Sequence, residues 1–327
     1  MHIGIVGGHG HHYLRHLREN PIDGTPVQFG VCGDGHDDAR AVALCKTMPG
    51  ARWFDSLNQL IAVHKPDVVS VGAVYGYNGD LVAQALVFDV PVVSDKPIAA
   101  NWKQLETLQI LTDGTRRRVI TEFPFRTQRE FLATRDVVLR GGVGKVALIT
   151  AQKSYRFGTR PAWYADRNAY GGTLLWIASH AIDVVPFVTG QRVTRVTGTG
   201  GNVTRDAYGT MEDHVTVTMQ LDGGASAVIH ADFLRPTAAP SHGDDRLRVA
   251  GATGVVEVRD ERCRLITDTQ GETDITDSVP VPQHTAEQLL RAALGETGVF
   301  STEHSLHTAS LLLKCRDAVD GAVWLDV

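Results

Sequence analysis

Short apolar runs alternate with helix-compatible stretches through the first 122 residues, and this alternation restricts the fold more than any other feature. The apolar runs fall at residues 2–6, 27–32, 66–71, 91–94 and 118–122. The stretches that suit helices fall at residues 11–17, 56–64, 80–88 and 102–111. Strands and helices that alternate in this way form a parallel sheet with helices on both faces. The sequence therefore predicts an α/β domain with a doubly wound parallel sheet over residues 1–122.

The pattern changes after residue 123. Between residues 193 and 265, apolar and polar residues alternate with the short period that is typical of half-buried antiparallel strands. Helices are expected at residues 131–140, 173–183, 287–294 and 303–319. We therefore expect residues 123–327 to form an α+β domain with a large, mostly antiparallel open sheet. The exposed face of such a sheet suits packing against a second copy of the chain.

Composition excludes several classes of protein. The formal net charge is −5 and no long basic run occurs, which argues against nucleic acid as a main partner. The four cysteines are scattered without a Cys-x-x-Cys pair, which argues against a disulfide framework and fits the reducing cytoplasm. Met1 leads directly into a predicted strand, and polar residues interrupt the apolar stretch 174–188. We expect a cytoplasmic protein with no membrane segment.

A carboxylate, an amine and a proline follow the apolar run 91–94, as Asp95, Lys96 and Pro97. Proline lacks a backbone N–H, so the strand must end there and Lys96 is placed at its carboxyl end. Ligands of doubly wound sheets bind at that edge. Lys96 is therefore a candidate acid, base or electrostatic clamp, and Asp95 a candidate to orient it. An ordinary loop lysine is the alternative.

A glycine-rich turn follows the first predicted strand, and a predicted helix follows the turn. Strand, glycine turn and helix form the context that a dinucleotide phosphate site needs. In the usual Gly-x-Gly-x-x-Gly spacing, Gly7 takes the first position, His9 the second and His12 the third, while Gly8 and Gly10 flank His9. The fingerprint is degenerate, so a tight turn without a ligand remains the alternative.

The histidines of this turn, His9, His11, His12 and His16, raise the question of a metal site. No carboxylate or cysteine joins them at the spacing of metal ligands, so we expect no metal. Asp34 follows the second predicted strand, close to where a ribose-binding acid is expected. Further acids follow and no basic residue comes before Arg40, which favours NAD over NADP because acids repel a 2′-phosphate. An acidic surface loop is the alternative for Asp34.

A second group of candidates lies in the half after residue 123. On a helix over residues 173–183, Trp176, His180 and Asp183 share one face. His180 is a candidate proton carrier, because the pKa of histidine lies near neutral pH. A hydrogen-bonded core histidine is the alternative, and Asp183 is expected to support the structure or to orient a neighbour.

The segment of residues 155–164 combines arginines, aromatic residues and glycine, which suits a rim that closes over a ligand. Its candidates for substrate contact are Tyr155, Arg160, Trp163 and Tyr164. A surface loop with solvated arginines is the alternative. Arg126 is a candidate for substrate contact or for a salt bridge between domains.

Two of these motifs together suggest a family. Asp95-Lys96-Pro97 matches a Glu-Lys-Pro motif with Asp in place of Glu, and the glycine-led segment from residue 171 ends in His-x-Ile-Asp at residues 180–183. Residues 251–254 are similar to a late strand turn of the same family. Over essentially its whole length, the chain resembles the Gfo/Idh/MocA oxidoreductases, which include glucose–fructose oxidoreductase and inositol dehydrogenases. The resemblance implies a Rossmann-type domain followed by a substrate domain, and a homodimer or homotetramer.

Three positions depart from the family pattern. Trp176 stands where an Asp four residues before the histidine is common, and Asn78 stands where a His is common. The third departure is the glycine fingerprint. Trp176 either forms a wall for a sugar or cyclitol ring or belongs to the core.

The resemblance implies an NAD-dependent oxidoreductase that acts on a sugar, a cyclitol or a related polyol. NAD would place its pyrophosphate on residues 7–10 and its ribose near Asp34, with Tyr75, Asn78, Asp95 and Pro97 also near the cofactor. Lys96 would bind the reacting hydroxyl and the nicotinamide ribose, and His180 would take the hydroxyl proton. The alternatives are a ligand-binding regulatory protein that has lost catalysis, and an epimerase or hydrolase that recycles its NAD.

Overall fold

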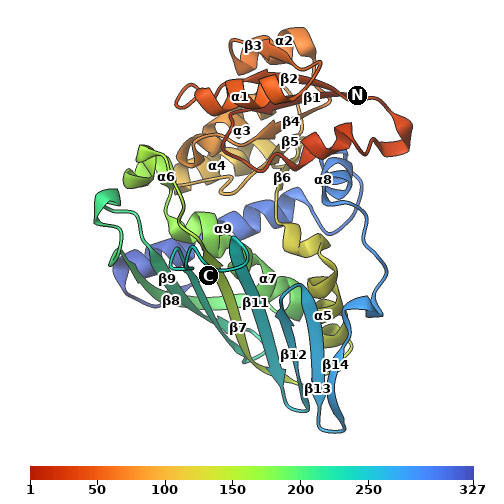
Figure 1. Ribbon diagram of the computed structural model, residues 1–327, viewed down its shortest axis with the longest axis vertical. Coiled ribbons are helices and arrows are strands. Elements are labelled where there is room, and N and C mark those ends of the chain that lie inside the picture. The colour runs from red at the N-terminus through yellow and green to blue at the C-terminus, as the bar shows by residue number, and fades with distance from the viewer. The chain divides into compact units, whose positions relative to one another are not determined.

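The computed structural model describes all residues, 1–327, which form two compact units (Figure 1). Unit 1 comprises Met1–Glu122, Asn168–Gly171 and Gln283–Ser310. Unit 2 comprises Phe123–Arg167, Gly172–Pro282 and Leu311–Val327. Two short returns of the chain therefore complete unit 1. Helices α6 (Arg167–Tyr170) and α9 (Thr302–Gly321) contain residues of both units.

Unit 1 contains a six-stranded sheet in which every pair of neighbours is parallel, in the order β3-β2-β1-β4-β5-β6. Its strands are β1 His2–Val6, β2 Gln28–Cys32, β3 Arg52–Phe54, β4 Val68–Val71, β5 Val92–Ser94 and β6 Val119–Thr121. Its helices are α1 Ala39–Thr47, α2 Leu57–His64, α3 Asn78–Val87, α4 Trp102–Thr112 and α8 Thr285–Leu294. The predicted doubly wound sheet is confirmed. The strand order reverses between β1 and β4, and the carboxyl ends of strands at such a point bind ligands.

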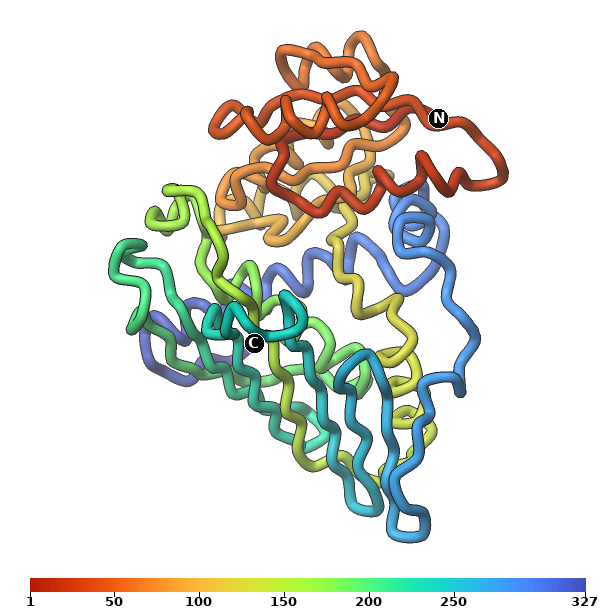
Figure 2. Tube along the Cα trace, in the orientation of Figure 1, coloured from red at the N-terminus to blue at the C-terminus, as the bar shows by residue number.

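The segment after the glycine turn differs from the predicted helix. Residues Tyr13–Arg18 form a 3₁₀ helix, which packs beside α8 (Figure 2). His12 precedes it in the left-handed conformation, with φ 47°, and Pro21 follows it closely. Proline cannot donate the backbone hydrogen bond that a longer helix needs, so the helical segment stays short.

Unit 2 contains a nine-stranded sheet in the order β14-β13-β12-β11-β7-β10-β9-β8-β15. Only β7 and β10 pair in parallel, so the predicted, mostly antiparallel sheet is confirmed. The strands are β7 Val146–Tyr155, β8 Val193–Gly201, β9 His214–Leu221, β10 Ser226–Asp232, β11 Gly243–Gly251, β12 Gly254–Arg259, β13 Arg262–Thr267, β14 Gln270–Asp274 and β15 Leu325–Asp326.

Helices α5 (Arg129–Leu139) and α7 (Ser179–Thr189) pack against each other and against strands of this sheet. A π-helical turn, Leu174–Ala178, leads directly into α7. Arg167–Thr189 is apolar and long enough to cross a membrane, but 94% of its most apolar window is buried inside the protein. Such burial is typical of a core helix.

We predict that Gly76→Ala destabilises unit 1. A Cβ at Gly76 would lie 1.7 Å from the carbonyl oxygen of Asn168, in the first of the two returning segments. Because backbone must move to relieve this contact, we expect a loss of about 1–3 kcal/mol in the free energy of unfolding. Urea unfolding measures it. Gly298→Ala is the control, since a Cβ there meets nothing within 4 Å. Equal stability of the two variants would contradict the prediction.

Candidate active site

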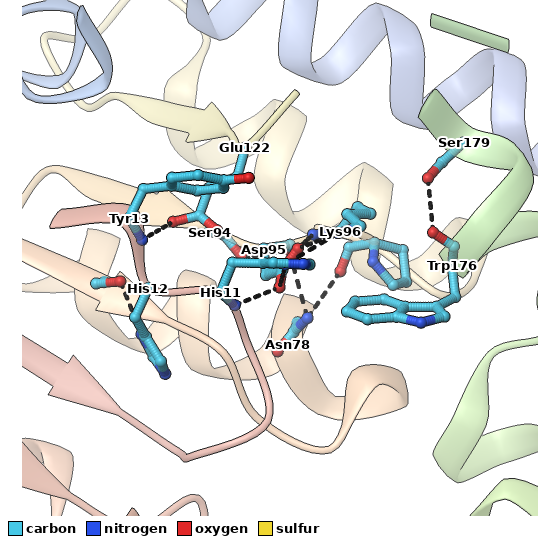
Figure 3. A network of polar contacts seen from close by, with 12 residues as sticks. His11, His12, Tyr13, Asn78, Ser94, Asp95, Lys96, Glu122, Trp176 and Ser179 are labelled. Atoms are coloured by element: carbon cyan, nitrogen blue, oxygen red, sulfur yellow. Dashed lines mark hydrogen bonds and ion pairs between the residues drawn. The ribbon is translucent and has the colours of Figure 1, made fainter. Parts of the chain in front are cut away.

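Lys96 lies directly after β5 and is 2% exposed. Its Nζ is 2.9 Å from Asp95 Oδ1 and 3.2 Å from His11 Nδ1 (Figure 3). Asp95 Oδ2 in turn accepts a hydrogen bond from the His11 backbone N–H and lies 2.8 Å from His11 Nδ1. The carboxylate therefore binds the lysine and the glycine loop together.

The charges of this group fix its protonation. Burial disfavours the ionised form of Asp95, but the Lys96 ammonium and His11 outweigh burial and hold the pKa of Asp95 well below its usual range. His11 Nδ1 lies between an ammonium donor and a carboxylate acceptor, so it can bind one of them at a time. The side chain of His11 is 44% exposed, which gives this buried group a contact with solvent.

Glu122 follows β6, the strand next to β5, and is fully buried. Its Oε1 accepts a hydrogen bond of 3.1 Å from the Tyr13 backbone N–H, whereas Oε2 has no partner. Burial and the nearby Asp95 carboxylate raise the pKa of Glu122 well above its usual value. Its position beside a charged pair therefore favours the neutral form of Glu122.

Ligand atoms of His11, Asp95 and Glu122 lie within 4.8 Å of one another, as in a metal site. The Lys96 ammonium contacts two of these three residues. A metal ion would have to compete with that ammonium for the same lone pairs, so this geometry favours the lysine over a metal.

Asn78 supports the Lys96 loop from α3. Its side-chain amide donates to the carbonyl oxygens of Asp95, at 3.4 Å, and Pro97, at 3.2 Å. Its Oδ1 accepts from the Ala73 backbone N–H at 2.9 Å. Asn78 is thus a positioning residue for the loop that carries Lys96.

The glycine turn between β1 and the 3₁₀ helix uses several of its own N–H groups. The N–H groups of His9 and Gly10 both donate to the Gly72 carbonyl, at 2.8 and 3.1 Å. Those of Gly8 and His12 donate to no group of the protein. Such N–H groups bind phosphate oxygens. The turn therefore fits a dinucleotide pyrophosphate. It offers only the N–H groups of Gly8 and His12, because those of His9 and Gly10 already bind the Gly72 carbonyl.

His12 stands at the position of the third fingerprint glycine and is 1% exposed. Its Nδ1 lies 2.8 Å from Ser70 Oγ, and its Nε2 has no hydrogen-bond partner. Burial lowers the pKa of His12 to about 4, so the ring is neutral. His9 is also buried, and its Nε2 lies 2.9 Å from Asp37 Oδ2.

Asp34 bridges two loops at the sheet edge. Its Oδ1 accepts from the backbone N–H groups of His36 and Asp37, at 2.8 and 2.9 Å, and its Oδ2 accepts from that of Val74, at 2.7 Å. A carboxylate offers about four lone-pair positions, which leaves room for one ribose hydroxyl. Tyr75 follows in the same loop and is buried against Tyr170, with ring centroids 6.2 Å apart.

In unit 2, His180 lies in the first turn of α7 and is 4% exposed. Its ring contacts Phe125 and Phe123, at centroid distances of 5.4 and 5.9 Å. Trp176 is buried in the π-helical turn, where its carbonyl accepts from Ser179 Oγ at 3.0 Å (Figure 3).

Arg126 and Asp183 form a buried bidentate ion pair within unit 2. Arg126 Nε and Nη2 donate to the two carboxylate oxygens, each at 2.9 Å. The Arg126 guanidinium also lies 4.6 Å from the ring centroid of Phe187. Asp183 therefore orients the Arg126 guanidinium.

Segment 155–164 is ordered by aromatic contacts. Trp163 and Tyr164 pack together with centroids 4.6 Å apart, and Arg160 lies over the ring of Tyr164. The Tyr155 ring contacts that of His242 in a tilted arrangement, with centroids 4.9 Å apart.

Sequence reasoning missed His11 and Glu122 as members of the Lys96 group. The sequence predicted His11 to be a solvated or phosphate-side histidine rather than a metal ligand, and did not predict its contact with Asp95 and Lys96. Glu122 ends an apolar run that becomes a strand, so its place at the carboxyl end of β6 was the available signal.

Comparisons with known proteins match both halves of the chain. Residues 1–123 match a family model described as the oxidoreductase family, NAD-binding Rossmann fold, and residues 131–257 match the GFO/IDH/MocA C-terminal domain. Inositol 2-dehydrogenase of Rhizobium meliloti is 24% identical over 72% of this chain and 76% of its own length. D-glucoside 3-dehydrogenase of Escherichia coli is 28% identical over 49% of this chain and 46% of its own length.

Solved structures share the whole fold. A candidate oxidoreductase of Thermotoga maritima superposes with a TM-score of 0.90 and 28% identity over 100% of both chains. An inositol dehydrogenase homologue of Azotobacter vinelandii, complexed with NAD⁺, has a TM-score of 0.81 and 17% identity over 100% of this chain and 97% of its own. At that identity, the second similarity shows the fold alone.

We predict that Glu122→Gln changes the pH dependence of stability. The folded pKa of Glu122 lies above its unfolded value, so the stability that the protonated carboxyl contributes is present at low pH and is lost as pH rises toward the folded pKa. Glutamine keeps the shape of the protonated acid but cannot ionise. The stability of the variant relative to the parent should therefore rise with pH above about 4, by about 1.4 kcal/mol per unit of pKa difference.

Urea unfolding between acidic and mildly alkaline pH measures this difference. Glu106→Gln, on the exposed face of α4, is the control and should show no such trend. A difference between Glu122→Gln and the parent that stays constant with pH would show that Glu122 ionises normally.

Proposed function

Because the chain belongs to the Gfo/Idh/MocA family of oxidoreductases, we propose that it transfers a hydride between NAD and a hydroxyl or carbonyl group of a sugar, a cyclitol or a related polyol. The family supplies the reaction class and the NAD-binding Rossmann domain. The names of the inositol and glucoside dehydrogenases support the substrate class. The observation that carries the proposal is the buried Lys96 ammonium, which Asp95 and His11 hold at the carboxyl end of β5.

The proposed roles follow from the chemistry of the residues. Lys96 Nζ donates a hydrogen bond to the reacting oxygen, and its charge stabilises that oxygen as it loses its proton. His180 takes the hydroxyl proton in the oxidative direction and returns it in the reductive direction. Asp95 and Asn78 position Lys96, since both bind its loop.

NAD, when bound, supplies the hydride acceptor. The residues that would hold it are the turn residues Gly7, Gly8, His9, Gly10 and His12, the ribose-side residues Asp34 and Tyr75, and the loop from Asp95 to Pro97 with Asn78. Arg126, Tyr155, Arg160, Trp163, Tyr164, Trp176 and Asp183 remain the proposed substrate-side residues. We also propose a cytoplasmic homodimer or homotetramer that associates through the nine-stranded sheet, on which Leu148 and Val228 are exposed.

We predict that the protein binds NADH and prefers it to NADPH, because the acids after β2 repel a 2′-phosphate. Energy transfer from tryptophan to the nicotinamide during titration measures both affinities. Micromolar NADH binding supports the oxidoreductase. If neither nucleotide binds at millimolar concentrations, the reduced donor set of the turn has lost the cofactor, and a ligand-binding regulatory role replaces hydride transfer.

We predict that Lys96→Met lowers kcat by about 10²- to 10⁴-fold, the usual contribution of one acid–base group. Asp95 would lose its ammonium partner, so the melting temperature should also fall, while the far-UV circular dichroism at lower temperature stays that of the parent. Lys103→Met, at an exposed position of α4, is the matched control and should keep full activity. An active, folded Lys96→Met variant contradicts the proposed role.

A further inference from the structure

Three half-buried arginines of unit 2 have no carboxylate partner: Arg156, Arg160 and Arg205. Each is half-buried, and the Nε of each is buried without a hydrogen-bond partner. Their side chains make only long hydrogen bonds to carbonyl oxygens, from Arg160 to Arg156 and from Arg205 to Phe233, each at 3.3 Å. A half-buried guanidinium without an acceptor is costly, so this group calls for an explanation.

Aromatic rings hold two of these guanidinium groups in place. The Cζ of Arg160 lies 5.0 Å from the ring centroid of Phe233 and 5.5 Å from that of Tyr164. The Cζ of Arg205 lies 4.7 Å from the centroid of Phe157. A guanidinium stacked on an aromatic face keeps its edge N–H groups available for a planar acceptor. The rings therefore preorganise donors without neutralising them.

Further cations lie near His242, whose ring contacts that of Tyr155. The Arg156 backbone N–H donates to the His242 carbonyl at 3.0 Å, so the two residues are adjacent in space. Burial and the charges of Arg160, Arg156, Lys153 and Arg235 lower the pKa of His242. These cations act on one small region at the ends of β7 and β11.

Nearby carboxylates do not balance Arg156 and Arg160. Asp245 pairs with Lys153 at 2.6 Å, and Asp244 pairs with Arg235 and Arg246. Asp232 instead accepts hydrogen bonds from Ser154 Oγ and from the Leu234 backbone N–H. No carboxylate therefore pairs with Arg156 or Arg160.

We propose that Arg156 and Arg160, beside His242, bind an anionic group of the substrate, a carboxylate or a phosphate. Tyr155 and His242, which neighbour Arg156, line a pocket of about 950 Å³ together with Arg235 and Ser241. Glu130, Asp244, Asp245, Asp260 and Glu261 also line this pocket, so Arg156 and Arg160 mark its positively charged side. The proposal rests on the proposed function and narrows its substrate to an acidic sugar or a sugar phosphate. Guanidinium groups bind both anions through paired N–H donors.

The test compares D-glucose with D-glucuronate and D-glucose 6-phosphate, using the full-length protein. Binding is measured by calorimetry without cofactor and by kcat/KM with NAD. We expect at least one anionic sugar to bind about 10- to 100-fold more tightly than D-glucose, as for charge-assisted hydrogen bonds. Tighter binding of glucuronate alone identifies a carboxylate site, and tighter binding of glucose 6-phosphate alone identifies a phosphate site. Tighter binding of both identifies a general anion site.

Variants connect this preference to the arginines. Arg160→Gln and Arg156→Gln should each remove most of it, and Arg160→Lys should restore part of it. Arg192→Gln is the matched control, because Arg192 is 83% exposed and pairs with Asp222. The histidine NMR signal that His242→Gln removes should titrate at higher pH when an anion is bound, because the anion offsets the surrounding cations.

Outcomes of the binding and kinetic arms separate this proposal from the proposed function. Equal binding of neutral and anionic sugars, or an anion preference that survives both Gln variants, overturns the anion site while NADH binding and turnover still support the oxidoreductase. If Arg160→Gln fails to fold, Arg156→Gln decides alone. Anion binding that depends on these arginines in a protein that binds no NADH supports the site and overturns hydride transfer.

Discussion

The structure of unit 1 depends on the buried contact between Asp95 and Lys96. One carboxylate accepts from the Lys96 backbone N–H and Nζ through Oδ1, and contacts the His11 backbone N–H and ring through Oδ2. His11 is thereby held against Asp95 and Lys96 at one edge of the sheet, although it precedes them by 84 and 85 positions in the chain. A buried carboxylate that lost these donors would be strongly destabilising. The shape of the glycine turn and the position of Lys96 therefore depend on the same carboxylate.

The same contact accounts for the unusual turn. In a regular fingerprint, a third glycine allows the following helix to approach the sheet closely. Here His12 takes that place in the left-handed conformation and packs its neutral ring against Ser70. The chain leaves the turn as a short 3₁₀ helix, and the Tyr13 N–H binds Glu122. Burial and the Asp95 carboxylate favour the protonated form of Glu122 by raising its pKa. The turn that contains His12 and the buried Glu122 are thus joined by the hydrogen bond from the Tyr13 N–H.

Much of this fold could be predicted from the sequence, because burial imposes a pattern on each element separately. The runs that became β1, β4, β5 and β6 are mostly apolar and almost wholly buried, and the period of two in unit 2 marked the antiparallel strands. The strand Arg52–Phe54 and the helix Ala39–Thr47 were not predicted, since the strand is short and mostly exposed and the helix buries only Ala41. Lys96 could be placed because Pro97 ends its strand. The partners His11 and Glu122 could not, because their contacts depend on the order of strands in the sheet.

Unit 2 shows why charge balance must be read locally. The chain as a whole carries a formal net charge of −5, which by itself suggests little affinity for anions. Yet Asp232 binds a serine hydroxyl and a backbone N–H while Arg156 and Arg160 have no carboxylate partner. Folding alone would favour pairing these charges, since unpaired half-buried cations repel one another and lose hydration. Arg160, which aromatic rings preorganise, and the neighbouring Arg156 are better explained by selection for a ligand than by stability. The same argument separates them from Arg126, whose bidentate pair with Asp183 satisfies its charge within the protein.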